Sequence, residues 1–192
     1  MTYINDIKRA ISAVKKPYRQ WKDWYNGDVT MLERVFCYEF YHQFRKLMGK
    51  PKNRMKYKEL YFQGEITKYL EGRTKAPDFV LHSGQDKFIN QAVVIEVKTK
   101  ERIGKHHEEC NMSIDIIKLL SLMKKDGLAF KYGVFIGVNC DSAYLKEVIE
   151  GEDINTFSSY KDSFNNLYII GTEDNTPFTL GSLFLSRRTC NQ

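Results

Sequence analysis

The chain has 192 residues, of which 30 are Lys or Arg and 24 are Asp or Glu, so its formal net charge is +6. This length predicts a single domain that buries enough surface to fold without a disulfide or a structural metal. Hydrophobic residues make up 42% of the chain and charged residues 28%, a composition that argues against a disordered tail and against a membrane protein.

No segment of the sequence is suited to crossing a membrane. The longest apolar run, Ala92 to Val97, contains Glu96 and is far shorter than the ~20 residues that a span needs. The first residues carry charges throughout and lack the apolar stretch of a secretory signal. The four cysteines are scattered and form no CxxC pair, which is typical of reduced thiols. We therefore expect a cytoplasmic protein.

Positive charge is concentrated in the first part of the sequence. Residues 1–76 contain 17 basic and 8 acidic residues, whereas residues 77–192 contain 13 and 16. The densest basic stretch, which contains no acid, comprises Arg45, Lys46, Lys50, Lys52, Arg54, Lys56 and Lys58. Two interpretations remain open. The stretch is either a solubilising loop or a surface that binds nucleic-acid phosphates, with Lys50, Lys52 and Arg54 as its candidate contacts.

Two helices are predicted before this basic stretch. The first covers residues 3–25 and ends in an aromatic group, Trp21, Trp24 and Tyr25, that we expect to pack on the main domain. The second runs from about Thr30 to Met48. At helical spacing its inward face comprises Leu32, Glu33, Phe36, Phe40, Phe44 and Leu47, and its opposite face comprises Arg34, Tyr38, Tyr41 and Arg45.

Strands dominate the middle of the sequence. Three are predicted over residues 57–67, 78–82 and 91–99, and their short connections indicate an antiparallel meander. A helix over residues 108–125 follows, with Ile114, Ile117, Leu120 and Leu122 or Met123 at helical spacing. The remaining elements are a buried strand over 132–138, a weak helix over 142–150 and a last strand over 167–170.

This α-β-β-β-α-β order predicts an α/β fold with a mixed central sheet flanked by helices. Residues 1–192 form one domain in this interpretation. It has an N-terminal helical extension over 1–26, a core over 28–138 and a C-terminal extension over 139–192.

Charged residues occupy strand positions that are normally apolar. Glu96 and Lys98 end the β-branched strand that begins at Ala92, and they lie on one face because they are two residues apart. Asp78 opens the preceding predicted strand, so antiparallel pairing would bring it close to Glu96. One interpretation is an ordinary ion pair at a strand end. The other is a Mg²⁺ or Mn²⁺ site, because carboxylate oxygens are the ligands that hard cations prefer and a metal-bound water can attack phosphorus.

These residues resemble the signature of the PD-(D/E)XK nuclease superfamily. The resemblance rests on Pro77-Asp78 and on Glu96-Val97-Lys98 after an apolar run, and it covers about residues 28–138. It implies the restriction-endonuclease-like fold, whose core has the same element order. It also implies that Asp78, Glu96 and the Val97 carbonyl are metal ligands and that Lys98 is the catalytic lysine.

A further carboxylate from the second predicted helix would complete such a site. The segment from Gly27 to Arg34 is similar to the corresponding segment of archaeal junction resolvases, which implies a metal-site role for Glu33. Glu33 also fits a capping box with Thr30, which would make it an ordinary helix-start residue. Glu39 is the reserve candidate. A Zn²⁺ site of His106, His107 and Cys110 is disfavoured because no second group of ligands completes it.

The sequence therefore predicts a metal-dependent phosphodiesterase that requires Mg²⁺ or Mn²⁺, with a DNA endonuclease or exonuclease as the favoured form. The alternative is a catalytically silent module of the same fold that binds nucleic acid or a protein partner. Homodimerisation or assembly into a larger complex is compatible with either hypothesis.

Overall fold

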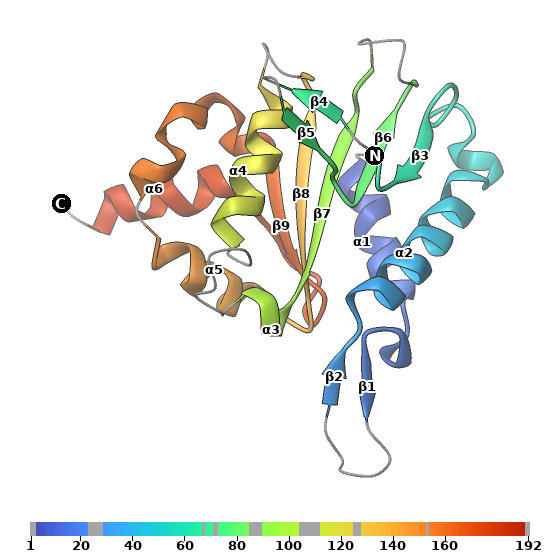
Figure 1. Cartoon of the computed structure of the whole chain (residues 1–192), viewed down its shortest axis with the longest axis horizontal. Coiled ribbons are helices and arrows are strands. Elements are labelled where there is room, and N and C mark those ends of the chain that lie inside the picture. Colours follow the sequence, from blue (N-terminus) through green and yellow to red (C-terminus); the bar gives the residue numbers. More distant parts are fainter. Residues whose placement is uncertain are drawn as a thin grey trace.

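Figure 1 shows the computed structural model, which describes residues 3–22, 29–66, 68–70, 73–84, 90–103, 112–124, 128–152 and 154–190. A six-stranded mixed sheet is flanked by helices, which confirms the predicted α/β class. The sheet consists of β3 (Tyr61–Gly64), β6 (Phe79–His82), β7 (Val93–Thr99), β8 (Tyr132–Val138), β9 (Leu167–Gly171) and β10 (Pro177–Thr179). The α-helices of the described ranges are α1 (Tyr3–Ala13), α2 (Glu33–Met48), α3 (Lys100–Ile103), α4 (Met112–Met123), α5 (Ser142–Glu150) and α6 (Leu180–Cys190).

Smaller elements lie outside the sheet. Two hairpins pair β1 (Gln20–Lys22) with β2 (Val29–Met31) and β4 (Lys68–Leu70) with β5 (Arg73–Lys75). Three 3₁₀ segments are η1 (Lys16–Tyr18), η2 (Pro51–Asn53) and η3 (Ile154–Asn166). In the described ranges no helix is both long and apolar enough to cross a bilayer.

Strand β7 joins two kinds of pairing. The sheet order is β10-β9-β8-β7-β6-β3. Strands β3, β6 and β7 pair antiparallel, so the predicted meander is confirmed, with the β4–β5 hairpin inserted between its first two strands. Strand β8 pairs parallel to β7 and to β9, and α4 lies in the long connection that parallel pairing between β7 and β8 requires.

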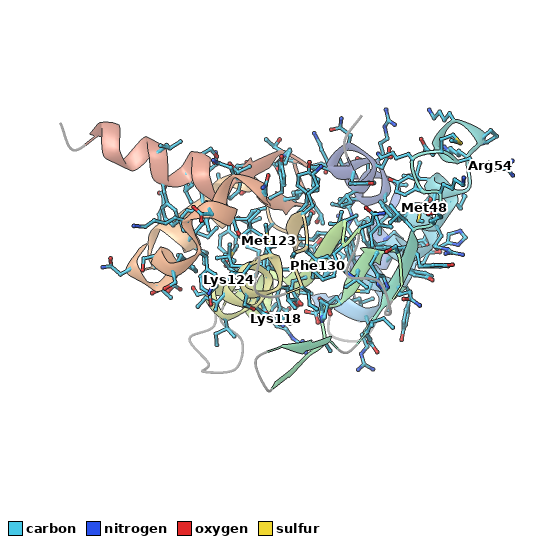
Figure 2. The ribbon with its side chains drawn as sticks, turned by 90° about the horizontal axis from the view of Figure 1, so that it is seen from above. Met48, Arg54, Lys118, Met123, Lys124 and Phe130 are labelled. Atoms are coloured by element: carbon cyan, nitrogen blue, oxygen red, sulfur yellow. The ribbon has the colours of Figure 1, made fainter. Side chains whose placement is uncertain are left out.

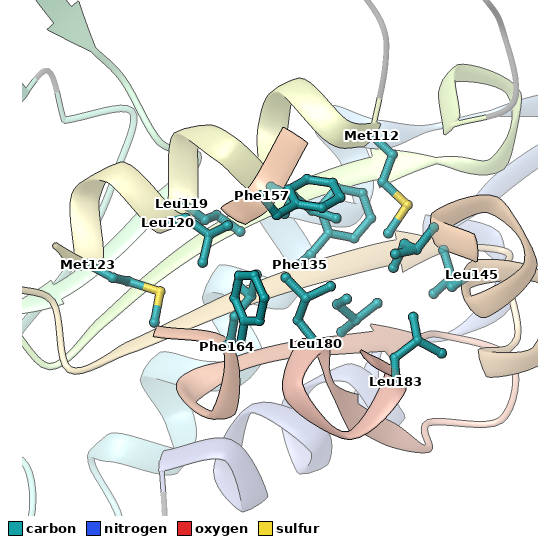
Figure 3. Packing of buried hydrophobic residues seen from close by; sticks show 14 of the residues in the cluster. Met112, Leu119, Leu120, Met123, Phe135, Leu145, Phe157, Phe164, Leu180 and Leu183 are labelled. Carbon is teal, nitrogen blue, oxygen red and sulfur yellow. The ribbon is translucent and has the colours of Figure 1, made fainter. Parts of the chain in front are cut away.

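Each face of the sheet carries its own hydrophobic cluster. Helices α1 and α2 cover one face, and α4, α5, η3 and α6 cover the other (Figure 1). Figure 3 shows the second cluster, where α4 and the C-terminal elements pack their apolar side chains together. Along β7, Val93, Ile95 and Val97 belong to the α1–α2 cluster and Val94 belongs to the α4 cluster. Because side chains alternate along a strand, Glu96 and Lys98 face α4.

An aromatic cluster attaches α2 to the sheet. Phe36, Phe40 and Phe44 are fully buried, as the helical spacing predicted. The Phe40 ring centroid lies 6.1 Å from that of Phe62 on β3 and 5.6 Å from that of Phe79 on β6. This packing holds the middle of α2 against β3 and β6.

The predicted boundaries of the N-terminal elements are wrong. Helix α1 ends at Ala13, because the chain turns into a 3₁₀ segment with Pro17 in its first positions and then into β1. Helix α2 starts at Glu33 instead of Thr30, because residues 29–31 pair with β1. The strand predicted over 57–67 is confined to Tyr61–Gly64 in the described residues. Trp24 and Tyr25 lie outside those residues.

The predicted apolar spacing of α4 is confirmed at Leu120, Leu122 and Met123, which are buried, but it is wrong at Ile114. Ile114 is 50% exposed, whereas Met112, Ile116 and Leu119 are buried. Asp115 lies on the buried side as well. The inward face of α4 therefore includes a charged residue, which the apolar spacing did not identify.

Replacing Phe40 by Ala is expected to cost about 3–5 kcal/mol of unfolding free energy, because it leaves a cavity among four aromatic rings. Tyr38→Ala on the same helix is the matched control. Its side chain is 69% exposed, so a cost under about 0.5 kcal/mol is expected. Urea unfolding of the two variants measures both values. Equal costs would mean that the aromatic cluster does not anchor α2.

Candidate active site

Asp78 and Glu96 meet at one end of the sheet. Phe79 of β6 pairs with Ile95 of β7, and continuing this antiparallel register sets Asp78 opposite Glu96. The Val97 backbone N–H donates a hydrogen bond of 2.7 Å to Oδ2 of Asp78. This bond fixes the Asp78 carboxylate against β7 just beyond the last paired residue of β6. The convergence expected from the sequence is therefore present.

The Val97 backbone also faces this point. In a strand the N–H and C=O of one residue point to the same side, and the Val97 N–H points to Asp78. Its carbonyl therefore lies on the side where pairing with β6 ends at Phe79. The Val97 side chain, in contrast, is fully buried in the α1–α2 cluster. Only the backbone of Val97 is available as a ligand.

Helix α4 brings two charged residues that the sequence pattern did not identify. The Lys118 ammonium lies 2.7 Å from Oε1 of Glu96, and 3.5 Å from Oδ1 of Asp115. The Lys98 ammonium lies 3.5 Å from the other Asp115 oxygen, Oδ2. A signal was present in the sequence, since Asp115 and Lys118 are the only charged residues of α4 and are three positions apart. Such a pair in an apolar helix shares one face.

Glu33 lies at the first position of α2 and does not form the capping box. The residue before the helix is Leu32, no side chain caps the first turn, and Thr30 belongs to β2. Oε1 of Glu33 accepts a 3.1 Å hydrogen bond from Arg102 of α3. Its Oε2 is buried and has no hydrogen-bond partner among the described residues. Glu39 instead accepts a 2.6 Å bond from Gln43, one turn further along α2.

A cleft of about 850 Å³ joins Glu33 to Asp78. The first turns of α2, the start of β6 and the α3 segment line it. Its charged residues are Glu33, Arg34, Glu65, Asp78, Glu101 and Arg102. The cleft therefore contains more acidic than basic side chains, a distribution suited to binding a cation. Lys98 and Glu96 do not line it and lie on the α4 side of β7.

Burial changes the ionisation of the carboxylates. Burial and the neighbouring charge of Asp78 raise the pKa of Glu96 to about 8, although Lys118 opposes this shift. Burial also raises the pKa of Asp78, against the hydrogen bond from Val97. The pKa of the Cys37 thiol is raised by burial and then by Asp78, Glu33, Glu65 and Glu96. All four carboxylates therefore act on the same region.

The donor set suits a hard cation with few protein ligands. Among the described residues no group of three or more His, Cys, Asp or Glu side chains lies close enough to hold a metal ion. Asp78 and Glu96 are nevertheless adjacent, and Mg²⁺ is commonly held by one or two carboxylates with water in its other positions. Buried Oε1 of Glu96 also lacks a well-directed hydrogen bond in the described part of the chain. The residues present fit Mg²⁺ or Mn²⁺ on these grounds.

The basic residues lie at the other end of α2 from Glu33. Helix α2 has 16 residues, and at ~1.5 Å per residue it is ~24 Å long. Lys50, Lys52 and Arg54 follow its C-terminal end and are exposed. Figure 2 shows Arg54 at the edge of the molecule, far from Lys118. The structure does not bring these basic residues to the cleft.

One residue of the basic stretch has a structural role instead. Lys56 donates a 2.7 Å hydrogen bond to the fully buried Asp6 of α1, which also accepts one from Tyr57. Lys56 therefore attaches the basic stretch to α1. The candidate Zn²⁺ ligands His106, His107 and Cys110 lie outside the described residues.

Glu96 is expected to make the protein less stable as pH rises. Its pKa is about 8 in the folded protein and near the ordinary value of 4.5 when unfolded, so between these values the folded state holds a proton that the unfolded state has lost. Stability contributed by that proton is complete below about pH 4.5 and is lost as pH rises through about 8. Glu96→Gln should remove this loss, which is on the order of a few kcal/mol.

Urea unfolding in EDTA at pH 5, 7 and 9 measures the difference between wild type and Glu96→Gln. The variant should gain stability over wild type as pH rises. Glu39→Gln, which changes a carboxylate outside the cleft, should follow wild type at every pH. The same pH dependence in wild type and in Glu96→Gln would contradict the assignment of the raised pKa to Glu96.

Comparison with known proteins gives no relative for this chain: no protein-family model, no curated protein and no solved structure matches it significantly.

Proposed function

We propose that the chain is a metal-dependent nuclease that hydrolyses phosphodiester bonds, with DNA as the expected substrate. The observation that carries this proposal is the hydrogen bond from Val97 N–H to Asp78, which sets two carboxylates of neighbouring strands side by side at a sheet end. Lys98 lies two residues after Glu96 on the same face of β7. Two carboxylates can hold a divalent cation that activates a water, and an ammonium on the same face of β7 can offset charge on a phosphate.

The element order supports the same proposal. Helix α2, the antiparallel strands β3, β6 and β7, helix α4 and the parallel strand β8 follow the α-β-β-β-α-β order of the restriction-endonuclease-like core. The β4–β5 hairpin and the C-terminal elements after β8 are additions to that order. A restriction-endonuclease-like topology is accordingly part of the proposal.

Each residue of the site has a separate role in this proposal. Asp78, Glu96 and the Val97 carbonyl hold Mg²⁺ or Mn²⁺, and Glu33 adds negative charge from across the cleft. When bound, the cation lowers the pKa of a coordinated water and offsets negative charge on the phosphate. Lys98 cannot coordinate a cation as an ammonium. It orients the attacking water or stabilises charge on the phosphate oxygens.

Removing either ligand carboxylate is expected to abolish cleavage. Asp78→Asn and Glu96→Gln should each lower the cleavage rate by about 100-fold or more and weaken Mn²⁺ binding, because a neutral amide is a poor ligand for a hard cation. Lys98→Met should lose cleavage but keep Mn²⁺ binding. Cleavage of single-stranded, duplex and branched DNA and of RNA, each with Mg²⁺, Mn²⁺ or EDTA, measures the rate, and calorimetric titration measures the binding.

Two glutamates of α2 provide a matched comparison in the same assays. Glu33→Gln should lower cleavage because Glu33 lines the cleft, whereas Glu39→Gln should not. Loss of cleavage in Glu39→Gln alone would move the metal-site role to Glu39. Nucleic-acid binding by wild type without cleavage under any metal condition would instead support the silent module.

The length of α2 determines how long a nucleic acid must be to contact both the cleft and the basic residues. A duplex that contacts both the cleft and the far end of α2 must extend over ~24 Å, which is ~7 base pairs at ~3.4 Å each. Replacing Lys50, Lys52 and Arg54 together by Ala should therefore weaken binding only for duplexes longer than this. For long duplexes, the slope of log affinity against log salt should fall by about one unit for each phosphate that the variant no longer neutralises.

Fluorescence anisotropy with duplexes of about 6 and about 24 base pairs, at several salt concentrations, distinguishes the two interpretations of the basic stretch. The triple Ala variant should differ from wild type with the longer duplex and match it with the shorter one. An unchanged salt slope with the longer duplex would identify Lys50, Lys52 and Arg54 as a solubilising surface.

A further inference from the structure

Four charged side chains form a continuous chain between β7 and α4. Glu96 contacts Lys118 at 2.7 Å, Lys118 contacts Asp115 at 3.5 Å, and Asp115 contacts Lys98 at 3.5 Å. Their side chains are 2%, 24%, 10% and 18% exposed in that order. Asp115 therefore holds both ammonium groups with its two oxygens, but only Lys118 reaches the candidate ligand Glu96.

The contact between Glu96 and Lys118 brings opposite charges together without giving the Glu96 oxygen a well-directed hydrogen bond. Oε1 of Glu96 is buried and has no hydrogen bond of good direction within the described residues, although the Lys118 nitrogen is 2.7 Å away. An ionised carboxylate buried without compensation would be strongly destabilising, so a nearby positive charge stabilises the ionised form of Glu96. An ammonium is a point charge on a flexible four-carbon stem, which allows it to leave when another cation takes its place.

We propose that Lys118 is an internal counter-ion of Glu96 that competes with the divalent cation, and that Asp115 is the positioning residue that receives its ammonium when the cation binds. The inference rests on the proposed function, because it concerns the same metal site. Oε1 of Glu96 can contact either the Lys118 ammonium or a divalent cation. The free energy of cation binding therefore includes the cost of breaking the ion pair between Glu96 and Lys118. Lys118 therefore lowers the metal affinity of the site while stabilising the protein when no cation is bound.

Asp115 can accept the Lys118 ammonium after Glu96 releases it, because the two side chains are already in contact. Asp115 Oδ1 is 3.5 Å from the Lys118 nitrogen, so a small movement of the lysine side chain exchanges one carboxylate for the other. The ammonium then remains between β7 and α4, next to Lys98, and gives the site a second positive charge.

Calorimetric titration with Mg²⁺ tests the competition. Lys118→Met should bind Mg²⁺ at least 10-fold more tightly than wild type, because the competing ammonium is gone. Lys124→Met is the matched control: it removes an exposed lysine that directly follows α4, and its affinity should change less than 3-fold. Lys118→Arg should bind Mg²⁺ more weakly than wild type, because a guanidinium holds a carboxylate with two hydrogen bonds.

Thermal unfolding in EDTA gives an independent measurement. Lys118→Met should melt below wild type, since Glu96 loses its counter-ion, and Mg²⁺ should raise its melting temperature more than that of wild type. If Lys118→Met does not fold, the opposite shift expected for Lys118→Arg still tests the proposal.

Equal Mg²⁺ affinity in wild type, Lys118→Met and Lys118→Arg would overturn the inference and leave the metal site in place. Absence of Mg²⁺ binding in all of these proteins would overturn the proposed function and the inference together.

Discussion

The cost of placing the Glu96 carboxylate inside the protein constrains the structure around it. Glu96 is 2% exposed, and an unpaired charge at such a position would destabilise the fold by several kcal/mol. Lys118 reduces this cost from α4, and the raised pKa of Glu96 shows that the compensation is incomplete. Helix α4 must therefore keep a charged pair on its inward face. Because the compensation is incomplete, a further positive charge next to Glu96 would stabilise its ionised form.

The change of pairing direction at β7 creates the place for this carboxylate. Strand β6 is antiparallel to β7 and ends its pairing at Phe79, while β8 continues parallel beside β7 as far as Thr99. The last residues of β7 thus have a partner strand on one side only within the described part of the sheet. The Val97 N–H on the other side binds Asp78 instead of a strand. This hydrogen bond therefore takes the place of the next β6–β7 pairing and fixes the Asp78 carboxylate beside Glu96.

Charge is separated along α2. The acidic cleft includes Glu33 at the first residue of the helix, and the exposed basic residues Lys50, Lys52 and Arg54 follow its last residue. The aromatic cluster around Phe40 keeps the helix fixed on the sheet, so the two ends keep their separation. An extended polyanion could contact both ends of this rigid helix, whereas a mononucleotide could not.

Local patterns in the sequence identified the α/β class, the meander and the pair Asp78 and Glu96, because strand alternation and helix periodicity depend on neighbours in the chain. The stripe of Phe36, Phe40 and Phe44 followed from the same rule. The apolar spacing of α4 did not identify Asp115 and Lys118, because their partners lie far away in the sequence. It also could not fix the start of α2, since residues 29–31 pair with β1. Only the docking of α4 on β7 decided that Glu96 has a lysine partner, and only the direction of α2 separated the basic residues from the cleft.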